Sequence, residues 1–111
     1  MQPPSNTQAL YLRHAELCKV FSHPKRLELI NVLRDQELSV GELAQRLKIS
    51  IGNLSQHLAM MKSRGVVSSR KAGNVVYYHL TNPKMLEAFD LIRDILHEQI
   101  RQTSRLLGEG A

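Results

Sequence analysis

Apolar residues recur at helical intervals over most of the chain and crowd together at strand spacing in one short stretch. In the centre, the apolar positions that follow Ser50 recur every three or four residues, which places them on one side of a helix. These positions are Ile51, Leu54, Leu58 and Met61. The opposite side carries two amides, two small residues and one methionine: Gly52, Asn53, Gln56, Met60 and Ser63. We expect the apolar side to dock this helix and the polar side to stay open to a partner rich in hydrogen-bond donors and acceptors.

A β-hairpin is predicted directly after this helix. Gly65 provides the permissive backbone that ends the helix, and the following residues are rich in β-branched and aromatic side chains. The pair Gly73-Asn74 separates two strands, 66–71 and 75–80, at the spacing of a tight turn. Tyr77 and Tyr78 alternate across the second strand, so we expect one in the core and the other facing outward.

The segment before the central helix is predicted to form three helices, at residues 8–21, 25–35 and from about residue 40 to Leu47. Ser39 and Glu42 form a capping box that starts the third helix. Residues 48–50 connect it to the central helix, which Ser50 is placed to cap. Two short helices joined by such a turn, the second one polar outside, fit a helix-turn-helix. The expected inward positions are Leu27, Ile30, Leu33, Val40, Leu43, Ala44 and Leu47, whereas Arg26, Glu28 and Arg34 are expected to face water.

A long final helix is predicted from residue 83 to 107, roughly 35 Å at 1.5 Å per residue. Its apolar stripe comprises Met85, Phe89, Ile92, Leu96, Ile100, Thr103 and Leu107, widened by Leu91 and Ile95. The first helix also carries apolar positions: Leu10, Leu17 and Phe21, in line with His14. A domain of this size has no groove long enough for such a helix, so we expect a homodimer sealed by the first and last helices. The alternative is that the last helix folds back on its own domain.

Length and composition predict a single folded domain. The chain has 111 residues, of which 42% are hydrophobic. We expect the domain to span residues 8–107, with flexible tails at 1–7 and 108–111. The sequence shows no apolar run of about 20 residues and no signal pattern, so a cytoplasmic protein is expected. The fold class expected is mainly α with a small β-hairpin wing (α+β), a winged helix-turn-helix.

Charge is distributed unevenly along the chain. The segment 43–86 contains seven of the fifteen basic residues and none of the ten acidic residues, although the net charge of the whole chain is only +5. A run of charge is often only a solvated surface. Here it coincides with the helix-turn-helix pattern, which favours a polyanion such as double-stranded DNA as the partner.

The chain resembles the ArsR/SmtB family of winged-helix repressors over roughly residues 15–96. The matching pieces are HPKRL at 23–27, SVGELAQRL at 39–47, LSQHL at 54–58, GVV at 65–67 and GNVVYYHL at 73–80. Their order and spacing together make the resemblance specific. It implies a symmetric dimer whose two central helices enter successive major grooves while the wings touch flanking DNA, usually blocking transcription until an effector arrives.

The resemblance and the residue chemistry together predict a DNA-binding set. Gln56 can make a paired hydrogen bond to adenine, and Ser55 can serve base or backbone. Four basic side chains would neutralise phosphates. The full set is Ser50, Asn53, Ser55, Gln56, His57, Lys62, Arg64, Arg70, Lys71 and Asn74. His57 could instead be packed, and Asn53 could serve only the start of its helix.

The sequence does not identify an effector. The third helix lacks the cysteine pair of soft-metal sensors in the family, and Asp90, Asp94, His97 and Glu98 lack two of the histidines that the zinc-sensing pattern requires. His14 and Cys18 share a face of the first helix and could form a site across a twofold axis, but such pairs are more often packed. His14, Cys18 and His97 are therefore minor metal candidates, Cys18 is a minor redox candidate, and no cofactor is predicted.

Two other classes of function compete with a dimeric DNA-binding repressor. A winged-helix protein-interaction module without specific DNA binding could use the same basic surface for an acidic partner. An enzyme is not expected, because the sequence has no nucleophile elbow, no phosphate-binding glycine loop and no paired carboxylates in a cleft-forming context. Operator sequence, effector and the sign of regulation are not encoded in recognisable motifs.

Overall fold

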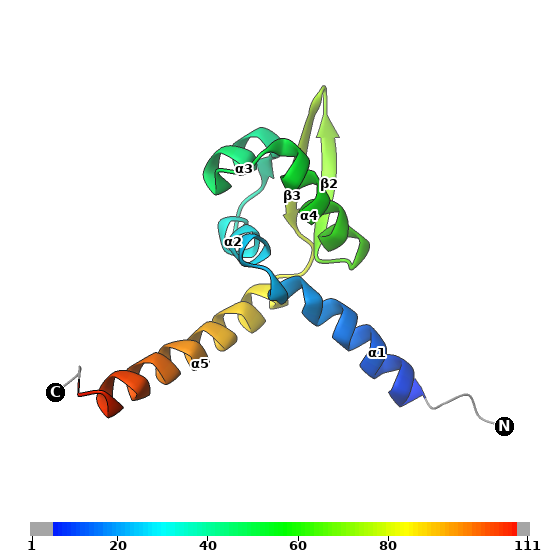
Figure 1. Cartoon of the computed structure of the whole chain (residues 1–111). Helices are drawn as coiled ribbons and strands as arrows, with labels where there is room; N and C mark the ends of the chain where they lie inside the picture. Colours follow the sequence, from blue (N-terminus) through cyan, green and yellow to red (C-terminus); the bar gives the residue numbers. More distant parts are fainter. Residues whose placement is uncertain (1–5, 109–111) are drawn as a thin grey trace.

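The computed structural model describes residues 6–108. Its elements are α1 (Asn6–Cys18), the short 3-10 helix η1 (Lys19–Ser22), α2 (Pro24–Val32), β1 (Leu38–Ser39), α3 (Val40–Leu47), α4 (Ile51–Ser63), β2 (Val67–Ala72), β3 (Val75–Leu80) and α5 (Lys84–Leu106). Helices α2, α3 and α4 gather beside the β2–β3 hairpin, while α1 and α5 leave this group in different directions (Figure 1). The arrangement is a winged helix-turn-helix, with the hairpin as the wing.

Local side-chain and backbone geometry explains the helix-turn-helix. The Ser39 hydroxyl accepts a hydrogen bond from the Glu42 amide at 3.1 Å, and the Glu42 carboxylate accepts one from the Ser39 amide at 3.2 Å. Lys48 ends α3 in the left-handed region, at φ +56°. The Ser50 hydroxyl then accepts from the Asn53 amide at 3.1 Å and starts α4. The predicted capping box, connection and second cap are confirmed.

The wing also follows its sequence signals, with one addition. Gly65 (φ +75°) ends the turn after α4, and Gly73 (φ +62°) makes the hairpin turn. Strands β2 and β3 pair from Val67 with Leu80 to Ala72 with Val75. The two-residue strand β1 pairs with β3 and gives the order β1-β3-β2. This third strand was not predicted, because two residues are too few to show a period.

One hydrophobic core joins the helices to the base of the wing. It consists of Val20, Leu29, Ile30, Leu33, Leu38, Leu43, Leu47, Leu54, Leu58, Met61, Val66, Val67 and Phe89. Helix α4 contributes three of these side chains, all less than 2% exposed. The predicted stripe of α4 is therefore confirmed except at Ile51. That side chain is 57% exposed, because the first residue of α4 lies beyond the edge of the core.

Other sequence expectations need correction. The first predicted helix is interrupted: α1 ends at Cys18 and a 3-10 turn carries Phe21. Helix α2 ends at Val32 rather than at Asp35, which adopts φ +56°. Leu27 is only half-buried. Asn6 and Thr7 belong to α1, so helix begins inside the predicted tail; residues 1–5 and 109–111 lie outside the described part.

Arg26 and Arg34 were expected to face water, but both make hydrogen bonds to neighbouring elements. Arg34 donates to both carboxylate oxygens of Asp90 in α5, at 3.0 and 2.7 Å. Arg26 donates to the carbonyl oxygens of Val20 and Lys19. Both side chains therefore hold neighbouring elements against α2.

The two tyrosines of β3 do not divide cleanly between core and solvent. Both are half-buried. Tyr78 packs against the core, whereas the Tyr77 ring lies under the Arg70 guanidinium, 4.7 Å from the ring centroid. The expected alternation across the strand holds, but Arg70 covers the outward ring.

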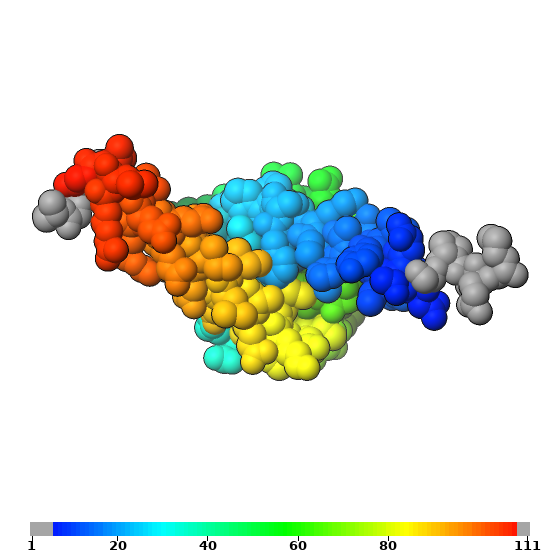
Figure 2. All heavy atoms as spheres, turned by 90° about the horizontal axis from the view of Figure 1, so that it is seen from below, coloured from blue at the N-terminus to red at the C-terminus, as the bar shows by residue number. Residues whose placement is uncertain are grey.

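Helices α1 and α5 extend beyond the core and leave apolar side chains exposed. Figures 1 and 2 show them projecting on opposite sides of the domain. The exposed apolar residues include Leu10, Tyr11 and Leu12 on α1 and Leu91, Ile92, Ile95, Leu96, Ile100 and Leu106 on α5. The radius of gyration is 17.6 Å, against about 13 Å for a compact domain of 100 residues. The last helix thus does not fold back on its own domain.

None of the helices within residues 6–108 combines the length and apolar character needed to cross a membrane.

Candidate nucleic-acid interface

The outer side of α4 is an exposed, uncharged surface of amides and hydroxyls. Because Leu54, Leu58 and Met61 are buried, the opposite side of the helix is turned outward, and Asn53, Ser55 and Gln56 are all exposed on α4. No carboxylate occurs in α4. Within residues 6–108 the Gln56 amide makes no side-chain hydrogen bond, so both its donor and its acceptor are available. Ser50 is also exposed, but its hydroxyl is engaged in capping α4.

His57 lies at the boundary between α4 and α2. Its ring is half-buried and its centroid lies 4.5 Å from that of His23, with the rings inclined by 55°. His23 caps α2, because its Nδ1 accepts a hydrogen bond from the Lys25 amide at 3.1 Å. Burial, followed by the charges of His23 and Arg26, lowers the pKa of His57. The structure thus places His57 in a packed contact rather than on the open side of α4.

Lys62 and Lys71 provide positive charge between α4 and the wing. Lys62 Nζ donates to Ser69 Oγ at 2.8 Å, which ties the last turn of α4 to β2. Lys71 lies two residues beyond Ser69 on the same face of the hairpin and is exposed. Asn74 is exposed in the turn at the hairpin tip. Lys62, Lys71 and Asn74 are thus exposed polar residues at the end of α4 and on the wing, and neither α4 nor the β2–β3 hairpin contains a carboxylate.

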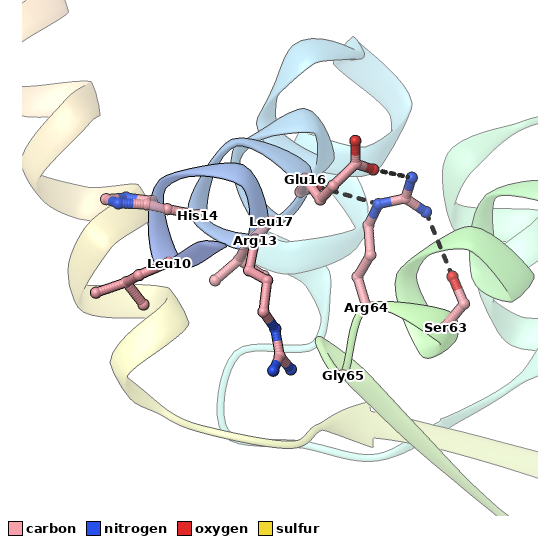
Figure 3. Close-up of a pocket in the computed structure, with 8 residues that line it drawn as sticks. All are labelled: Leu10, Arg13, His14, Glu16, Leu17, Ser63, Arg64 and Gly65. Atoms are coloured by element: carbon pink, nitrogen blue, oxygen red, sulfur yellow. Dashed lines mark hydrogen bonds and ion pairs between the residues drawn. The ribbon is translucent and has the colours of Figure 1, made fainter. Parts of the chain in front are cut away.

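Arg64 is committed to a contact within the chain. Its Nε donates to the Glu16 carbonyl at 3.0 Å and its Nη2 to the Glu16 carboxylate at 2.8 Å. Lys19, and secondly Arg64, lower the pKa of Glu16. This pair lies at the edge of a hollow of about 840 Å³ between α1 and the end of α4. In Figure 3, His14 points away from Arg64. The structure therefore uses Arg64 to hold α1 against α4.

Arg70 is likewise paired with a carboxylate. Its Nε lies 2.8 and 2.9 Å from the two carboxylate oxygens of Glu37, and its Nη2 lies 2.6 Å from one of them. Hydrogen bonding to Arg70 lowers the pKa of Glu37, and the same contact raises the pKa of Arg70. Sequence reasoning missed Glu16 and Glu37 because both lie outside the acid-free segment. The capping box beside Glu37 was visible, but no local signal indicated that β1 would reach the wing.

The minor sensing candidates do not converge in one chain. His14, Cys18 and His97 are exposed and lie on α1 and α5, which diverge. Asp90 is occupied by Arg34, which lowers the pKa of its carboxyl group. Within the described range of residues, no three His, Cys, Asp or Glu side chains form a group that could hold a metal ion. A site formed by His14 and Cys18 of two chains stays a prediction.

Known proteins are similar to this chain in sequence and in fold. A family model described as "Bacterial regulatory protein, arsR family" matches residues 23–69. The transcriptional activator HlyU of Vibrio cholerae is 37% identical over 92 residues, covering 80% of this chain and 85% of that protein. The biofilm growth-associated repressor of Xylella fastidiosa is 36% identical over 88 residues, covering 79% and 77%. The crystal structure of Rv0081 from Mycobacterium tuberculosis matches with a TM-score of 0.78 at 30% identity, covering 92% of this chain and 98% of that one. This chain therefore belongs to the arsR family of bacterial regulatory proteins and is a transcriptional regulator with a winged helix-turn-helix fold.

Proposed function

We propose that two copies of this chain form a dimer that binds an operator in duplex DNA and represses transcription until an effector releases it. The observation that carries this proposal is the outer surface of α4, where exposed Asn53, Ser55 and Gln56 stand on a helix without a carboxylate. Duplex DNA offers donors and acceptors on its base edges and a dense row of phosphates, and this surface complements both.

The exposed apolar helices support a dimer. The accessible surface of the chain is 8040 Å², whereas a compact folded monomer of this mass exposes about 6,200 Å². The excess exceeds the roughly 800 Å² that each partner buries in a standard interface. The apolar residues of α5 supply half of the large exposed hydrophobic side chains, and those of α1 supply a further quarter. A twofold dimer through α1 and α5 would cover them and present two copies of α4 to the same side.

Within this dimer, α4 would read bases and the lysines would neutralise phosphates. Two copies of α4 would enter major grooves one helical turn apart, roughly 34–36 Å between half-sites. Gln56 would make base-edge contacts, while Lys62 and Lys71 would contact phosphates. Asn74 would approach flanking DNA at the wing tip. Arg64 and His57 would act indirectly, by holding α4 in position.

The proposal is tested by comparing Gln56→Ala with Lys71→Ala in binding to DNA from the gene's own upstream region and to random duplex. Gln56→Ala should relax preference at particular bases, by about 1–3 kcal/mol for each paired hydrogen bond to a base that it removes. Lys71→Ala should weaken binding to all duplexes alike. It should also reduce the slope of log affinity against log salt concentration by about 0.9 for each phosphate that the lysine neutralises in the wild type. Fluorescence anisotropy over a range of salt concentrations measures both effects.

Arg101→Ala is the matched control, because Arg101 is an exposed cation on α5, away from the wing. It removes the same charge as Lys71→Ala and should leave the salt slope close to that of the wild type. If the wild-type protein prefers no upstream fragment over random duplex at moderate salt, operator binding is refuted. Salt-sensitive binding to an acidic protein instead of DNA would favour the protein-interaction module.

A further inference from the structure

The Glu37 carboxylate lies against the wing, although Glu37 is about 30 residues away from the hairpin in the sequence. Glu37 immediately precedes β1, and β1 pairs with β3 through Leu38 with Tyr78 and Ser39 with Tyr77. This register brings Glu37 beside His79, whose Nδ1 lies 3.6 Å from a Glu37 oxygen. A strand of only two residues thus delivers one negative charge to a surface whose own sequence has none.

Glu37 occupies the side of Arg70 that would otherwise bind an anion. An arginine has five N–H donors arranged in a planar fork, and here both Nε and Nη2 point at Glu37. The guanidinium also lies over the Tyr77 ring, which fixes its plane. The Glu37 side chain is 29% exposed and that of Arg70 is 55% exposed. The pair is therefore at the surface, within reach of a phosphate, but its net charge is zero.

Lys71 provides the internal comparison. It follows Arg70 directly and lies on the opposite face of the hairpin, because neighbouring residues of a strand alternate. Unlike Arg70, it makes no ion pair within residues 6–108. The wing therefore presents one lysine with its full charge and one arginine whose charge is cancelled.

We propose that Glu37 lowers the affinity of the wing for DNA by competing with phosphate for Arg70. Before Arg70 can contact a DNA phosphate, it must break its ion pair with Glu37. This inference rests on the proposed function. Exposed ion pairs contribute little free energy, so the exchange is accessible at room temperature. The carboxylate that is left behind then repels the DNA backbone. Because the competition is with phosphate, it weakens binding to every sequence equally.

The test is Glu37→Gln, which keeps the shape of the side chain and removes its charge. Binding is measured by fluorescence anisotropy with a labelled random-sequence duplex of about 30 base pairs, long enough for two half-sites. We expect Glu37→Gln to bind about two- to fivefold more tightly, the range that the free energy of an exposed ion pair allows. Glu98→Gln, which removes an exposed acid of α5, is the control for net charge.

A second comparison does not depend on changing Glu37. In the otherwise wild-type protein, Arg70→Gln should weaken DNA binding less than Lys71→Gln does, because Glu37 already cancels the charge of Arg70. In the Glu37→Gln background, Arg70→Gln should remove the whole gain in affinity. Thermal melts establish that each variant is folded, and if Glu37→Gln is not, the Arg70 and Lys71 comparison decides alone.

The outcomes separate this inference from the proposed function. If Glu37→Gln binds no more tightly than Glu98→Gln, or binds more weakly than the wild type, Glu37 does not compete with phosphate and the inference is overturned. If Arg70→Gln weakens wild-type binding as much as Lys71→Gln, the inference is overturned as well. If the wild-type protein binds no duplex even at low salt, the proposed function fails, and the inference fails with it.

Discussion

At the scale of single residues, the pairing of each cation decides what it can do. In the described part of the chain, Lys62 donates a hydrogen bond to a serine hydroxyl and Lys71 is exposed, whereas Arg64 and Arg70 are held by Glu16 and Glu37. Arginine forms such forked contacts with carboxylates more readily than lysine does. The two arginines therefore connect elements of the fold, and the two lysines carry the charge that is free to meet a phosphate.

Because of His57, we expect the free energy of unfolding to decrease at mildly acidic pH. Its pKa is lowered in the folded protein, so the unfolded chain binds a proton more readily once the pH falls to about 6.5, the ordinary histidine value. The contribution of His57 to the free energy of unfolding should thus be fully present above that pH, and it should decrease as the pH falls below that value. Urea denaturation midpoints at several pH values between about 7.5 and 5.5 measure the decrease; this range lies above the titration of the carboxyl groups.

His57→Gln should show a smaller decrease over this pH range, because the glutamine amide does not titrate. His97→Gln, at an exposed position of α5, should retain the wild-type decrease. An equal pH dependence of the wild type and His57→Gln would mean that the decrease originates elsewhere in the chain.

At the scale of elements, caps and glycines determine where the helix-turn-helix and wing begin and end. Ser39, Ser50, Gly65 and Gly73 all act where their residue types predict, because each interaction spans only a few residues of backbone. The element that was missed, β1, has no periodic pattern of its own. It forms only because β3 lies beside it with unpaired backbone groups.

The Ser50 cap offers a test of how strongly local chemistry stabilises α4. Ser50→Ala removes the acceptor of the Asn53 amide and should lower the free energy of unfolding by about 1 kcal/mol. Urea denaturation followed by circular dichroism measures the change.

Ser55→Ala is the matched control for this cap. Ser55 is exposed within the same helix, where alanine is the better helix former, so the variant should be as stable as the wild type or slightly more stable. Equal losses of stability in Ser50→Ala and Ser55→Ala would show that the cap has no special contribution.

At the scale of the whole molecule, two projecting helices expose apolar side chains that a single chain does not bury. Helix α5 buries only Phe89 fully, although its apolar stripe continues through Ile100 and beyond. These exposed apolar residues support the proposed dimer, since large exposed apolar patches mark interaction sites. In the proposed dimer, DNA binding and dimerisation would be coupled, because a single copy of α4 contacts only one half-site.

Leu96→Glu tests this coupling. Leu96 is 50% exposed in the single chain, and a carboxylate there would be buried without a partner in the dimer, which is costly. We expect the variant to be monomeric by sedimentation equilibrium and to bind the operator at least about tenfold more weakly, or 1.4 kcal/mol.

Arg101→Glu is the control for Leu96→Glu, because Arg101 faces away from the apolar stripe of α5. It should remain dimeric. A dimer in both variants would place the interface elsewhere on the molecule.

The sequence by itself determined the helices and the hairpin of this protein apart from η1 and β1, its helix-turn-helix caps, its wing turn and the buried side of α4 apart from Ile51, because those features depend on residues close together in the chain. Its ordered motifs were also enough to indicate the arsR family. Only the tertiary structure decided which cations are free. Glu16 and Arg64 lie 48 residues apart in sequence, and Glu37 and Arg70 lie 33 apart. An acid-free segment cannot reveal carboxylates that packing brings in from outside it, since charges interact through space and not along the chain.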